Sequence, residues 1–390
     1  MLAGQLKRAA ASFPVIILTG PRRAGKTFLL RHCFPKAAYH LLEDPDITSR
    51  VRHDPRTFLD EAGSPAILNE IQNVPELFNY IRSRADNSRG RACKWFLTGS
   101  QEAGLMKGVT ESMAGRAAIF QLLPLSQAES SKVSVVGGGF PEALARPAIA
   151  DTWYRSYIQT YLERDVRSIS SIRDLATFRR FLAIVASRAG SVLNKTDISG
   201  PLGVSVPTVT EWIGILETTM QIILVQPFYE NLGKRLIKSP KVYFTDSGLL
   251  CHLLGIGNNK ELNKSPFAGP VFEGYIASEI AKAQINAGKR REMYFFRDRQ
   301  GLEVDFIVPT AGRRMVLIEA KASQTIRPED AMPISRLIKS FKGHETSSFV
   351  VGRASPDRET AGELVPGVRV IHPELISEAL FGIKGKRNQP

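Results

Sequence analysis

The stretch GPRRAGKT, residues 20–27, combines residue types and a spacing that suit phosphate binding. It fits the pattern G-x-x-x-x-G-K-T, in which glycines let backbone N–H groups turn toward an anion. Lys26 would reach the terminal phosphates of ATP, and the Thr27 hydroxyl would ligate Mg²⁺. The candidate nucleotide-binding residues of this loop are Gly20, Pro21, Arg22, Arg23, Ala24, Gly25, Lys26 and Thr27.

Such a loop needs a strand before it and a helix after it, and the sequence supplies both. Residues 14–20, PVIILTG, form a short apolar run that is typical of a buried strand. Residues 26–34, KTFLLRHCF, predict a helix whose N-terminus faces the phosphates. The context therefore favours a phosphate-binding loop over a glycine-rich turn that fits the pattern by chance.

A second nucleotide motif is expected at the end of an apolar strand, where Asp-Glu usually stands. Residues 65–72, PAILNEIQ, place Asn69 and Glu70 there. Glu70 would polarise the attacking water. Asn69 has the shape of an aspartate without its charge, so Mg²⁺ loses one anionic neighbour. The next apolar strand, within 94–101, would place Ser100 against the γ-phosphate or the water.

Strands and helices alternate along this region, because further strand and helix patterns occupy 37–44, 54–62 and 74–86. Alternation of this kind predicts a parallel sheet that binds its ligand at the carboxyl ends of the strands. The loop, Glu70 and Ser100 all fall at that edge. Arg116 precedes a last strand and is either a surface arginine or an arginine finger that acts on a γ-phosphate, possibly that of a neighbouring subunit.

Four segments together, GPRRAGKT, ILNEIQ, FLTGSQ and SMAGR…LLPLS, resemble the AAA+ type ATPases of bacteria and archaea that carry a long C-terminal region of unknown function. The resemblance implies an ATP-binding ATPase. Members of that family usually have Asp at the position of Asn69, so the resemblance implies nucleotide binding together with slowed hydrolysis.

The composition limits the setting and the partners. The chain has 390 residues, a formal net charge of +14 and three widely spaced cysteines, which argue against a disulfide scaffold. Its apolar runs are too short to span a membrane, and we expect a cytoplasmic protein. The positive charge indicates a polyanion such as DNA, or a surface that is merely solvated.

The middle of the chain shows a pattern typical of DNA-binding proteins. Aromatic residues at helical spacing in 153–169 favour a buried helix face over a platform for bases. Residues 193–217 have the spacing of a helix-turn-helix. The following segments, 221–228 and 241–246, predict a hairpin wing around a basic turn with Lys234, Arg235, Lys238 and Lys241. Such a module would contact DNA or a protein partner.

The C-terminal third contains a second set of candidate catalytic residues. A predicted helix carries Glu273, a strand carries Asp305, and a third strand carries Glu319 and Lys321 on one face. Asp305 and Glu319, with Glu273, would hold Mg²⁺, and Lys321 would orient water or steady the scissile phosphate. The set is similar to the PD-(D/E)XK nuclease fold. The alternative is a structural cluster of ion pairs on a degenerate nuclease fold.

The sequence thus predicts an α/β protein in four regions. They are an AAA+ P-loop domain (1–130), a helical lid or linker (131–190), a winged helix-turn-helix (191–255) and a nuclease-like α/β domain (256–390). The predicted function is that of a DNA-associated ATPase with a metal-dependent, nuclease-like end, which could form an oligomer. The alternative is a non-cutting, nucleotide-gated scaffold that binds a protein through its winged helix.

Overall fold

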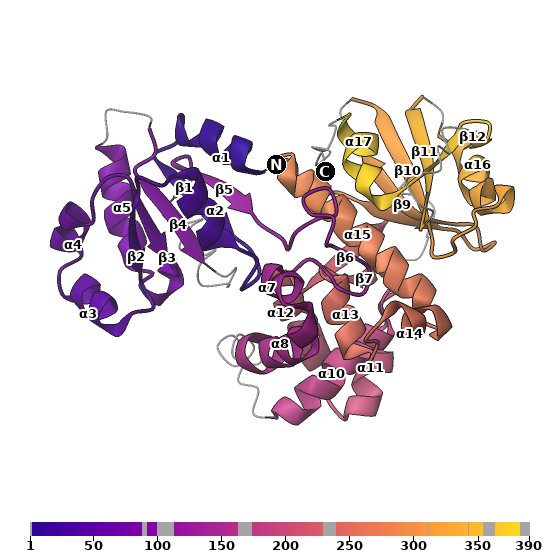
Figure 1. The fold of residues 1–390 in the computed structure, drawn as a ribbon, viewed down its shortest axis with the longest axis horizontal. Coiled ribbons are helices and arrows are strands. Elements are labelled where there is room, and N and C mark those ends of the chain that lie inside the picture. Colours follow the sequence, from indigo (N-terminus) through magenta and orange to yellow (C-terminus); the bar gives the residue numbers. More distant parts are fainter. Residues whose placement is uncertain are drawn as a thin grey trace.

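Two β-sheets, joined by a helical region, organise the chain (Figure 1). The structure is a computed structural model. It describes residues 2–87, 92–99, 113–162, 174–228, 239–310, 312–341, 343–353 and 363–382.

The N-terminal sheet is wholly parallel, in the order β2-β3-β4-β1-β5. Its strands are β1 (Val15–Thr19), β2 (Ala38–Leu41), β3 (Ala66–Asn69), β4 (Trp95–Gly99) and β5 (Ala117–Gln121). Every residue of β1, β3 and β4 is buried. Central parallel strands are covered on both faces, which explains their unbroken apolar runs.

Helices cover the two faces of this sheet through alternate strand residues. Ile16 and Leu18 share a core with α1 (Leu2–Ala10) and α2 (Lys26–Cys33). Val15 and Ile17 share the opposite core with α3 (Pro45–His53), α4 (Pro55–Glu61) and α5 (Leu77–Asp86). The predicted α/β domain with a parallel sheet is confirmed, and helices cover both of its faces.

A glycine-rich segment carries the chain from β5 to α7 (Pro141–Ala145) and α8 (Ala150–Tyr157), which continues as the π-helix η3 (Ile158–Leu162). Gly139 lies so close to Leu125 that an added Cβ would stand 2.1 Å from its carbonyl oxygen. The buried carboxylate of Asp246 accepts hydrogen bonds from the Gly139 N–H and the Tyr154 hydroxyl. Tyr154 and Tyr157 are buried, so the aromatic face of this helix belongs to the core, as expected.

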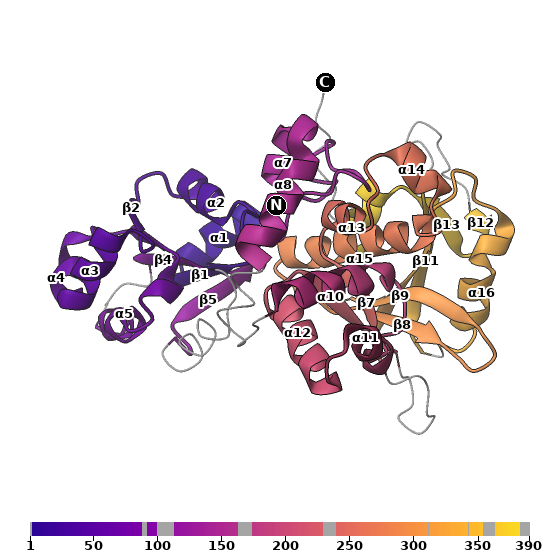
Figure 2. The same ribbon diagram turned by 90° about the horizontal axis from the view of Figure 1, so that it is seen from below.

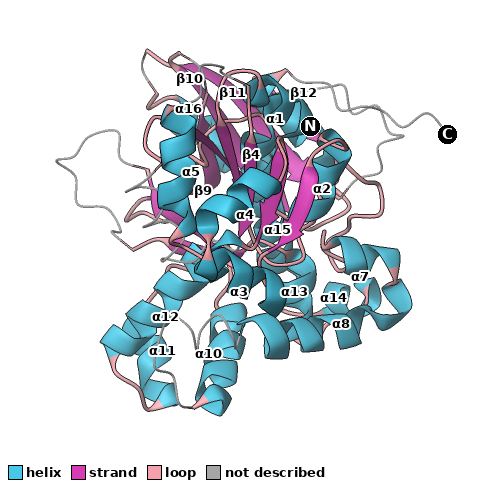
Figure 3. Ribbon diagram, turned by 90° about the vertical axis from the view of Figure 1, so that its left-hand side faces the viewer, coloured by secondary structure: helices cyan, strands magenta, loops and turns pink. Residues whose placement is uncertain are grey.

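The two helices and the tight turn expected in 193–217 are present as α11 (Lys195–Leu202) and α12 (Val206–Thr218), packed beside α10 (Leu175–Ser187) (Figure 3). Gly203, with φ 67°, ends α11, and the Ser205 hydroxyl caps α12 by accepting the Thr208 N–H. A left-handed residue after a helix and a serine before the next one are the signals that make this turn tight. Val209, Ile213 and Leu216 are buried as the apolar spacing predicts.

The second sheet is mixed and has the order β12-β13-β11-β10-β9-β8-β6-β7. Its strands are β6 (Ile222–Pro227), β7 (Lys241–Phe244), β8 (Tyr294–Arg297), β9 (Glu303–Pro309), β10 (Arg314–Lys321), β11 (Glu345–Gly352), β12 (Glu363–Val365) and β13 (Val368–Ile371). The hairpin β6–β7 forms as predicted, but β6 also pairs with β8, so the hairpin extends this sheet and is not a free wing. Basic residues Lys234, Arg235 and Lys238 of its turn lie outside the described residues.

Helix α15 (Ala268–Asn286) runs between this sheet and the helical region (Figures 1 and 2). The remaining helices are α13 (Ser247–Leu253), α14 (Asn259–Lys264), α16 (Met332–Ile338) and α17 (Ile376–Phe381), with 3₁₀ turns Ile71–Asn73, Pro147–Ile149, Pro328–Ala331 and Pro373–Leu375. One hydrophobic core extends from Leu123 to Leu380. The boundaries predicted at 190 and 255 therefore divide residues that share a core. Among the described helices, none combines the length and apolar composition that a bilayer crossing requires.

Candidate functional site: two lysines in two settings

The loop between β1 and α2 has the backbone shape that the phosphate-binding pattern predicts. Gly20 (φ 147°) and Gly25 (φ 96°) have positive φ angles, and so does Arg23 (φ 61°). A Cβ at Gly20 would stand 2.1 Å from the Leu122 carbonyl oxygen, so only glycine fits where β1 passes into the loop. Ala24 is buried beneath the turn. The loop opens directly into the N-terminus of α2, where backbone N–H groups favour an anion.

Lys26 folds over this loop and is 6% exposed. Its ammonium donates hydrogen bonds of 2.9 Å to the carbonyl oxygens of Gly20 and of Pro21. Both of these acceptors are neutral dipoles. Anionic phosphate oxygens are stronger acceptors for an ammonium, so a nucleotide can compete with these contacts.

Beside the loop, Asn69 at the end of β3 accepts two hydrogen bonds through one oxygen. Its Oδ1 lies 2.6 Å from the Thr27 hydroxyl and 2.6 Å from the Thr98 hydroxyl. The sequence predicted the juxtaposition of Thr27 and Asn69, but not the role of Thr98. The role of Thr98 could have been inferred, because Thr98 is a buried polar residue near the carboxyl end of β4, the strand next to β3.

Glu70 follows Asn69 in a left-handed conformation with φ 60°. Its carboxylate accepts a hydrogen bond from the Gln72 side chain, and its backbone N–H lies 3.4 Å from the Thr98 hydroxyl oxygen. Glu70 therefore stands at the same edge of the sheet as the loop, within the network around Asn69. Ser100, predicted to contact the γ-phosphate, lies outside the described residues.

Arg116 lies at the wrong edge of the sheet to act on a nucleotide held by its own chain. It precedes β5, whose first residue, Ala117, is level with Val15 at the start of β1. The phosphate-binding loop begins at the other end of β1. The Arg116 guanidinium pairs instead with Asp86, with 3.1 Å between Nη2 and Oδ2. Of the two alternatives for Arg116, this arrangement favours a surface arginine over a finger that acts on the nucleotide of its own chain.

The phosphate-binding loop also touches the helical region. Arg23 forms an ion pair with Glu142 of α7, with 3.5 Å between Nη1 and Oε1. The other oxygen of Glu142 accepts a 2.7 Å hydrogen bond from the Trp153 indole. A Cβ at Gly25 would lie 3.9 Å from Pro141 at the start of the same helix. The loop and α7 are thus in direct contact.

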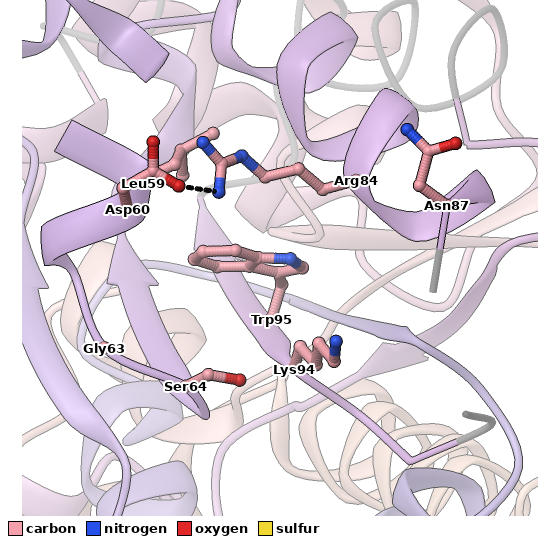
Figure 4. Close-up of a pocket in the computed structure, with 8 residues that line it drawn as sticks. All are labelled: Leu59, Asp60, Gly63, Ser64, Arg84, Asn87, Lys94 and Trp95. Atoms are coloured by element: carbon pink, nitrogen blue, oxygen red, sulfur yellow. Dashed lines mark hydrogen bonds and ion pairs between the residues drawn. The ribbon is translucent and has the colours of Figure 1, made fainter. Parts of the chain in front are cut away.

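A cavity of about 360 Å³ opens at the opposite edge of the N-terminal sheet (Figure 4). Trp95 lies between Lys94 and Arg84 in its wall, and Arg84 pairs with Asp60 at 2.7 Å. Lys94 stands before β4, so this cavity lies away from the phosphate-binding loop. None of the predicted site residues lines it.

The C-terminal sheet brings together the second predicted set of residues. The Ala320 N–H on β10 donates a 2.9 Å hydrogen bond to Asp305 on β9. Lys321 lies 2.8 Å from Glu319 on the same face of β10, as the two-residue spacing predicts. Glu273 of α15 completes the group, because its carboxylate lies beside Asp305 through a shared lysine partner. These side chains lie together in the structure, and their metal-binding and catalytic roles stay predictions.

The shared partner is Lys241 of β7, which the sequence assigned to a DNA-contacting wing. Its side chain is 3% exposed. Its Nζ lies 2.8 Å from Glu273 Oε1, 2.6 Å from Glu303 Oε1 and 3.8 Å from Asp305 Oδ1. The Tyr243 hydroxyl, also on β7, donates a hydrogen bond to Glu273. Lys241 therefore cannot contact DNA, and that part of the wing prediction is wrong.

Burial and neighbouring charge set the protonation of this cluster. Burial raises the pKa of Asp305 well above its usual value, and the Glu273 and Glu319 carboxylates raise it further. Burial also raises the pKa of Glu319, against the opposing effect of Lys321. Burial would lower the pKa of Lys241, but the carboxylates of Glu273, Asp305 and Glu303 outweigh it, so that pKa is raised and the lysine stays charged.

The side chains of this region do not form the metal site that the sequence predicted. Within the described ranges, no group of three or more His, Cys, Asp or Glu side chains is arranged to hold a metal ion. Glu273, Asp305 and Glu319 are close together, but a lysine ammonium lies among the carboxylates. The residues do not fit a bound divalent ion in this arrangement.

Three family models match consecutive parts of the chain. Residues 12–131 match an AAA domain. Residues 129–260 match a domain of unknown function, DUF8612, and residues 268–368 match another, DUF4143. The first match covers the parallel sheet and its phosphate-binding loop, so the chain contains an AAA-type ATPase domain.

Relatives that match most of this chain are found in bacteria and archaea. The uncharacterized protein Rv2008c of Mycobacterium tuberculosis is 30% identical over 320 residues, which cover 80% of this chain and 71% of the relative. Protein Mb2031c of Mycobacterium bovis matches equally. The uncharacterized protein MJ1544 of Methanocaldococcus jannaschii is 21% identical over 366 residues, with 84% of this chain and 79% of the relative covered.

Two solved structures show distant similarity. The Walker-type ATPase PABY2304 of Pyrococcus abyssi aligns with a TM-score of 0.44 and 15% identity, over 65% of this chain and 94% of that one. The STAND protein PH0952 of Pyrococcus horikoshii aligns with a TM-score of 0.24 and 15% identity, over 72% and 47% of the two chains. At these values, neither similarity carries a conclusion about the chemistry of this chain.

Proposed function

Because this chain belongs to the protein family of Rv2008c and contains an AAA-type ATPase domain, we propose that it is an ATP-driven switch that binds DNA without cutting it. The observation that carries the nucleotide part is the group of Lys26, Thr27 and Asn69 at one edge of the sheet. Lys26 donates hydrogen bonds to the neutral carbonyl oxygens of Gly20 and Pro21, and Thr27 stands 2.6 Å from the asparagine oxygen.

The loop residues would hold the phosphates of ATP, with Lys26 moving from the carbonyls of Gly20 and Pro21 to the β- and γ-phosphates. Mg²⁺ prefers oxygen ligands, and the Thr27 hydroxyl beside Asn69 Oδ1 offers such oxygens. When bound, the metal would neutralise charge on the phosphates. Glu70 would orient the attacking water and take its proton. Because Asn69 adds no negative charge beside the metal, hydrolysis in this proposal is slow.

Titration with a fluorescent ATP analogue in Mg²⁺ tests this proposal. Lys26→Ala removes a charged hydrogen-bond donor, which weakens binding by about 1.5–3 kcal/mol, or roughly 10- to 150-fold. Lys36→Ala removes an exposed lysine after the same helix and should bind as the wild type does. Equal affinities of wild type and Lys26→Ala would contradict a phosphate-binding role for this loop.

The contact between the loop and α7 supports a route from ATP to the rest of the chain. Phosphates at the loop compete with the carboxylate of Glu142 for the Arg23 guanidinium, since both are anions. Glu142 also holds Trp153, whose ring stacks on Tyr157 in the core of the helical region. In this proposal, ATP binding shifts α7 and α8 relative to the sheet.

DNA is the proposed partner because of the net charge of +14 and the helix-turn-helix geometry of α11 and α12. Ser205, Thr210 and Glu211 are exposed at the start of α12, where such a helix would meet the major groove. The basic turn that includes Lys234, Arg235 and Lys238 would add phosphate contacts.

Changing Lys234, Arg235 and Lys238 together to Ala tests the DNA proposal. Each lost phosphate contact should reduce the slope of log affinity against log salt by about 0.9 on duplex DNA. A triple variant of the exposed residues Lys36, Lys132 and Lys339 removes the same charge elsewhere and serves as the control. Equal slopes for the two triple variants would assign the binding to net charge alone.

A nucleotide-gated scaffold that binds a protein through α11 and α12 is the second candidate function. The observation that favours it is Lys241 among the carboxylates, because a cutting role would need a metal in that place. The two candidate functions predict different DNA affinities. A scaffold would bind DNA no more tightly than the control variant does. Arg116 would act in either case only on the nucleotide of a neighbouring subunit.

A further inference from the structure

We propose that the Lys241 ammonium is the resident cation of the C-terminal site and occupies the place where a nuclease of similar design would hold a divalent metal. The site comprises Lys241 and four carboxylates, Glu273, Glu303, Asp305 and Glu319, and is called the carboxylate cluster below. This proposal does not depend on the ATPase or DNA proposals.

The position of Lys241 is central to the cluster. Its Nζ contacts Glu273 of α15 at 2.8 Å and Glu303 of β9 at 2.6 Å, and reaches Asp305 at 3.8 Å. The Lys241 side chain is 3% exposed, Glu273 and Asp305 are mostly buried, and Glu303 is partly exposed at the rim of the cluster. Tyr243, the next inward-facing residue of β7, directs its hydroxyl to the same oxygen of Glu273. One short strand thus supplies both the cation and a supporting donor.

Charge explains why a cation must be present. Several carboxylates close together in a buried place repel one another, and an uncompensated buried charge is strongly unfavourable. Lysine supplies one positive charge and three donors, enough for the oxygens of Glu273, Glu303 and Asp305. A divalent metal would supply two charges to the same oxygens. The two cations cannot share the place, because they repel each other and need the same acceptors.

A buried oxygen without a partner points to the capacity for a metal. Glu319 is 5% exposed, and Lys321 donates to its Oε1, whereas its buried Oε2 has no hydrogen-bond partner among the residues that the structure describes. The cluster therefore holds an acceptor that Lys241 does not use. Carboxylate oxygens are the ligands that Mg²⁺, Mn²⁺ and Ca²⁺ prefer. The carboxylates are not arranged around a metal ion while Lys241 lies among them. Without the ammonium, they have the charge and the oxygen ligands for such an ion once their side chains turn toward the vacated place.

Binding of Mn²⁺ to the full chain without nucleotide, followed by the EPR signal of the free ion, tests the proposal. Wild type should bind no Mn²⁺ at the cluster. Lys241→Ala should bind about one ion per chain, at least about tenfold tighter than wild type, because removal of the ammonium leaves the carboxylates without a cation. Lys321→Ala is the matched control: it removes a lysine that contacts only Glu319 among the described ion pairs and should behave as wild type.

Folding of the variants is checked by thermal unfolding with and without Mn²⁺. Mn²⁺ should raise the melting temperature of Lys241→Ala and leave that of wild type unchanged, because a ligand stabilises only the state that binds it. If Lys241→Ala does not fold, Lys241→Ala/Glu303→Gln removes one carboxylate with the ammonium and restores the charge balance.

Two outcomes would overturn the proposal. The first is a folded Lys241→Ala, or its double variant, that binds Mn²⁺ no better than wild type. The second is wild type that binds Mn²⁺ without nucleotide and loses this binding in Glu319→Gln. The second outcome is measured on proteins that keep Lys241, so it can overturn the proposal even if neither lysine variant folds.

Discussion

Lys26 and Lys241 are both buried lysines beside acidic or phosphate-binding motifs, yet their partners differ. Lys26 donates to two backbone carbonyls at 2.9 Å. Lys241 contacts two carboxylates at 2.6 and 2.8 Å and a third at 3.8 Å. A phosphate oxygen is anionic and is therefore a stronger acceptor for the Lys26 ammonium than these two carbonyls are. A lysine held by carboxylates already has the charge partners that it needs in the fold.

The difference between the two lysines shows that a motif predicts a function only together with the residues around it. The N-terminal site keeps a cation that an anion can recruit. The C-terminal site keeps anions that an internal cation neutralises. A buried lysine therefore indicates a ligand-binding site at the N-terminal sheet and a structural ion-pair cluster at the C-terminal sheet.

The largest expected effect is the loss of stability on removal of the Lys241 charge. Lys241→Met keeps the aliphatic volume but leaves buried carboxylates without their cation, so the free energy of unfolding should fall by about 3–5 kcal/mol. Lys321→Met, at a side chain that is 30% exposed, should lose less. Urea unfolding measures both. Equal losses would show that Lys241 is no more important to the cluster than Lys321.

The next effect concerns catalysis at the N-terminal site. Asn69→Asp adds a carboxylate beside Thr27 and the proposed metal, so steady-state ATP hydrolysis should rise about tenfold, equivalent to about 1.4 kcal/mol of barrier. Asn87→Asp makes the same substitution at an exposed residue after α5, away from the Thr27–Asn69–Thr98 network, so it should have little effect. No gain in Asn69→Asp, with wild type already turning over at about 1 s⁻¹ or faster, would remove the explanation of slow hydrolysis.

The pH dependence of stability sharpens the account of the cluster. The folded-state pKa of Asp305 is raised by burial and by Glu273 and Glu319, so the fold favours its protonated form. The stabilisation that protonated Asp305 gives the fold is present below the ordinary pKa of this group, 3.8. It is lost as the pH rises through the pKa of Asp305 in the folded state. Asp305→Asn lacks this loss, so its unfolding free energy relative to wild type should increase from pH 4 to pH 8. The exposed control Asp46→Asn should show no such trend; an equal trend in both would contradict this account.

The smallest expected effect on stability is at the contact between the loop and α7. Arg23 and Glu142 have half-exposed side chains, so Glu142→Gln should change the free energy of unfolding by less than about 1 kcal/mol. Glutamine can still accept the Trp153 N–H, but it no longer competes with phosphate for Arg23. The ATP-dependent change in tryptophan fluorescence should therefore shrink. A full change in the variant would place the nucleotide signal elsewhere.

The sequence predicted what depends on local patterns. Apolar runs and glycine positions located β1, the loop and α2, and the spacing of a short helix, a tight turn and a longer helix in 193–217 located α11 and α12. The position of Arg116 could also have been inferred from the sequence. Residues that precede a strand of a parallel sheet lie at the edge opposite to residues that follow a strand, so Arg116 lies at the edge away from the phosphate-binding loop.

The role of Lys241 was not available from local patterns. It closes a basic run in the sequence, but β6 pairs with the distant strand β8, and that pairing buries β7 against α15. Strand order in a mixed sheet depends on contacts between distant segments, so neither the burial nor the three carboxylate partners could be inferred from spacing.

Counting Mn²⁺ bound to wild type, with and without a non-hydrolysable ATP analogue, tests the difference between the two lysine sites most directly. The account predicts no bound Mn²⁺ without nucleotide, and about one ion per chain with it, held with the phosphates beside Thr27 and lost in Lys26→Ala. Mn²⁺ bound without nucleotide and retained in Lys26→Ala would contradict the account, because it would show that the carboxylate cluster accepts a metal while Lys241 is in place.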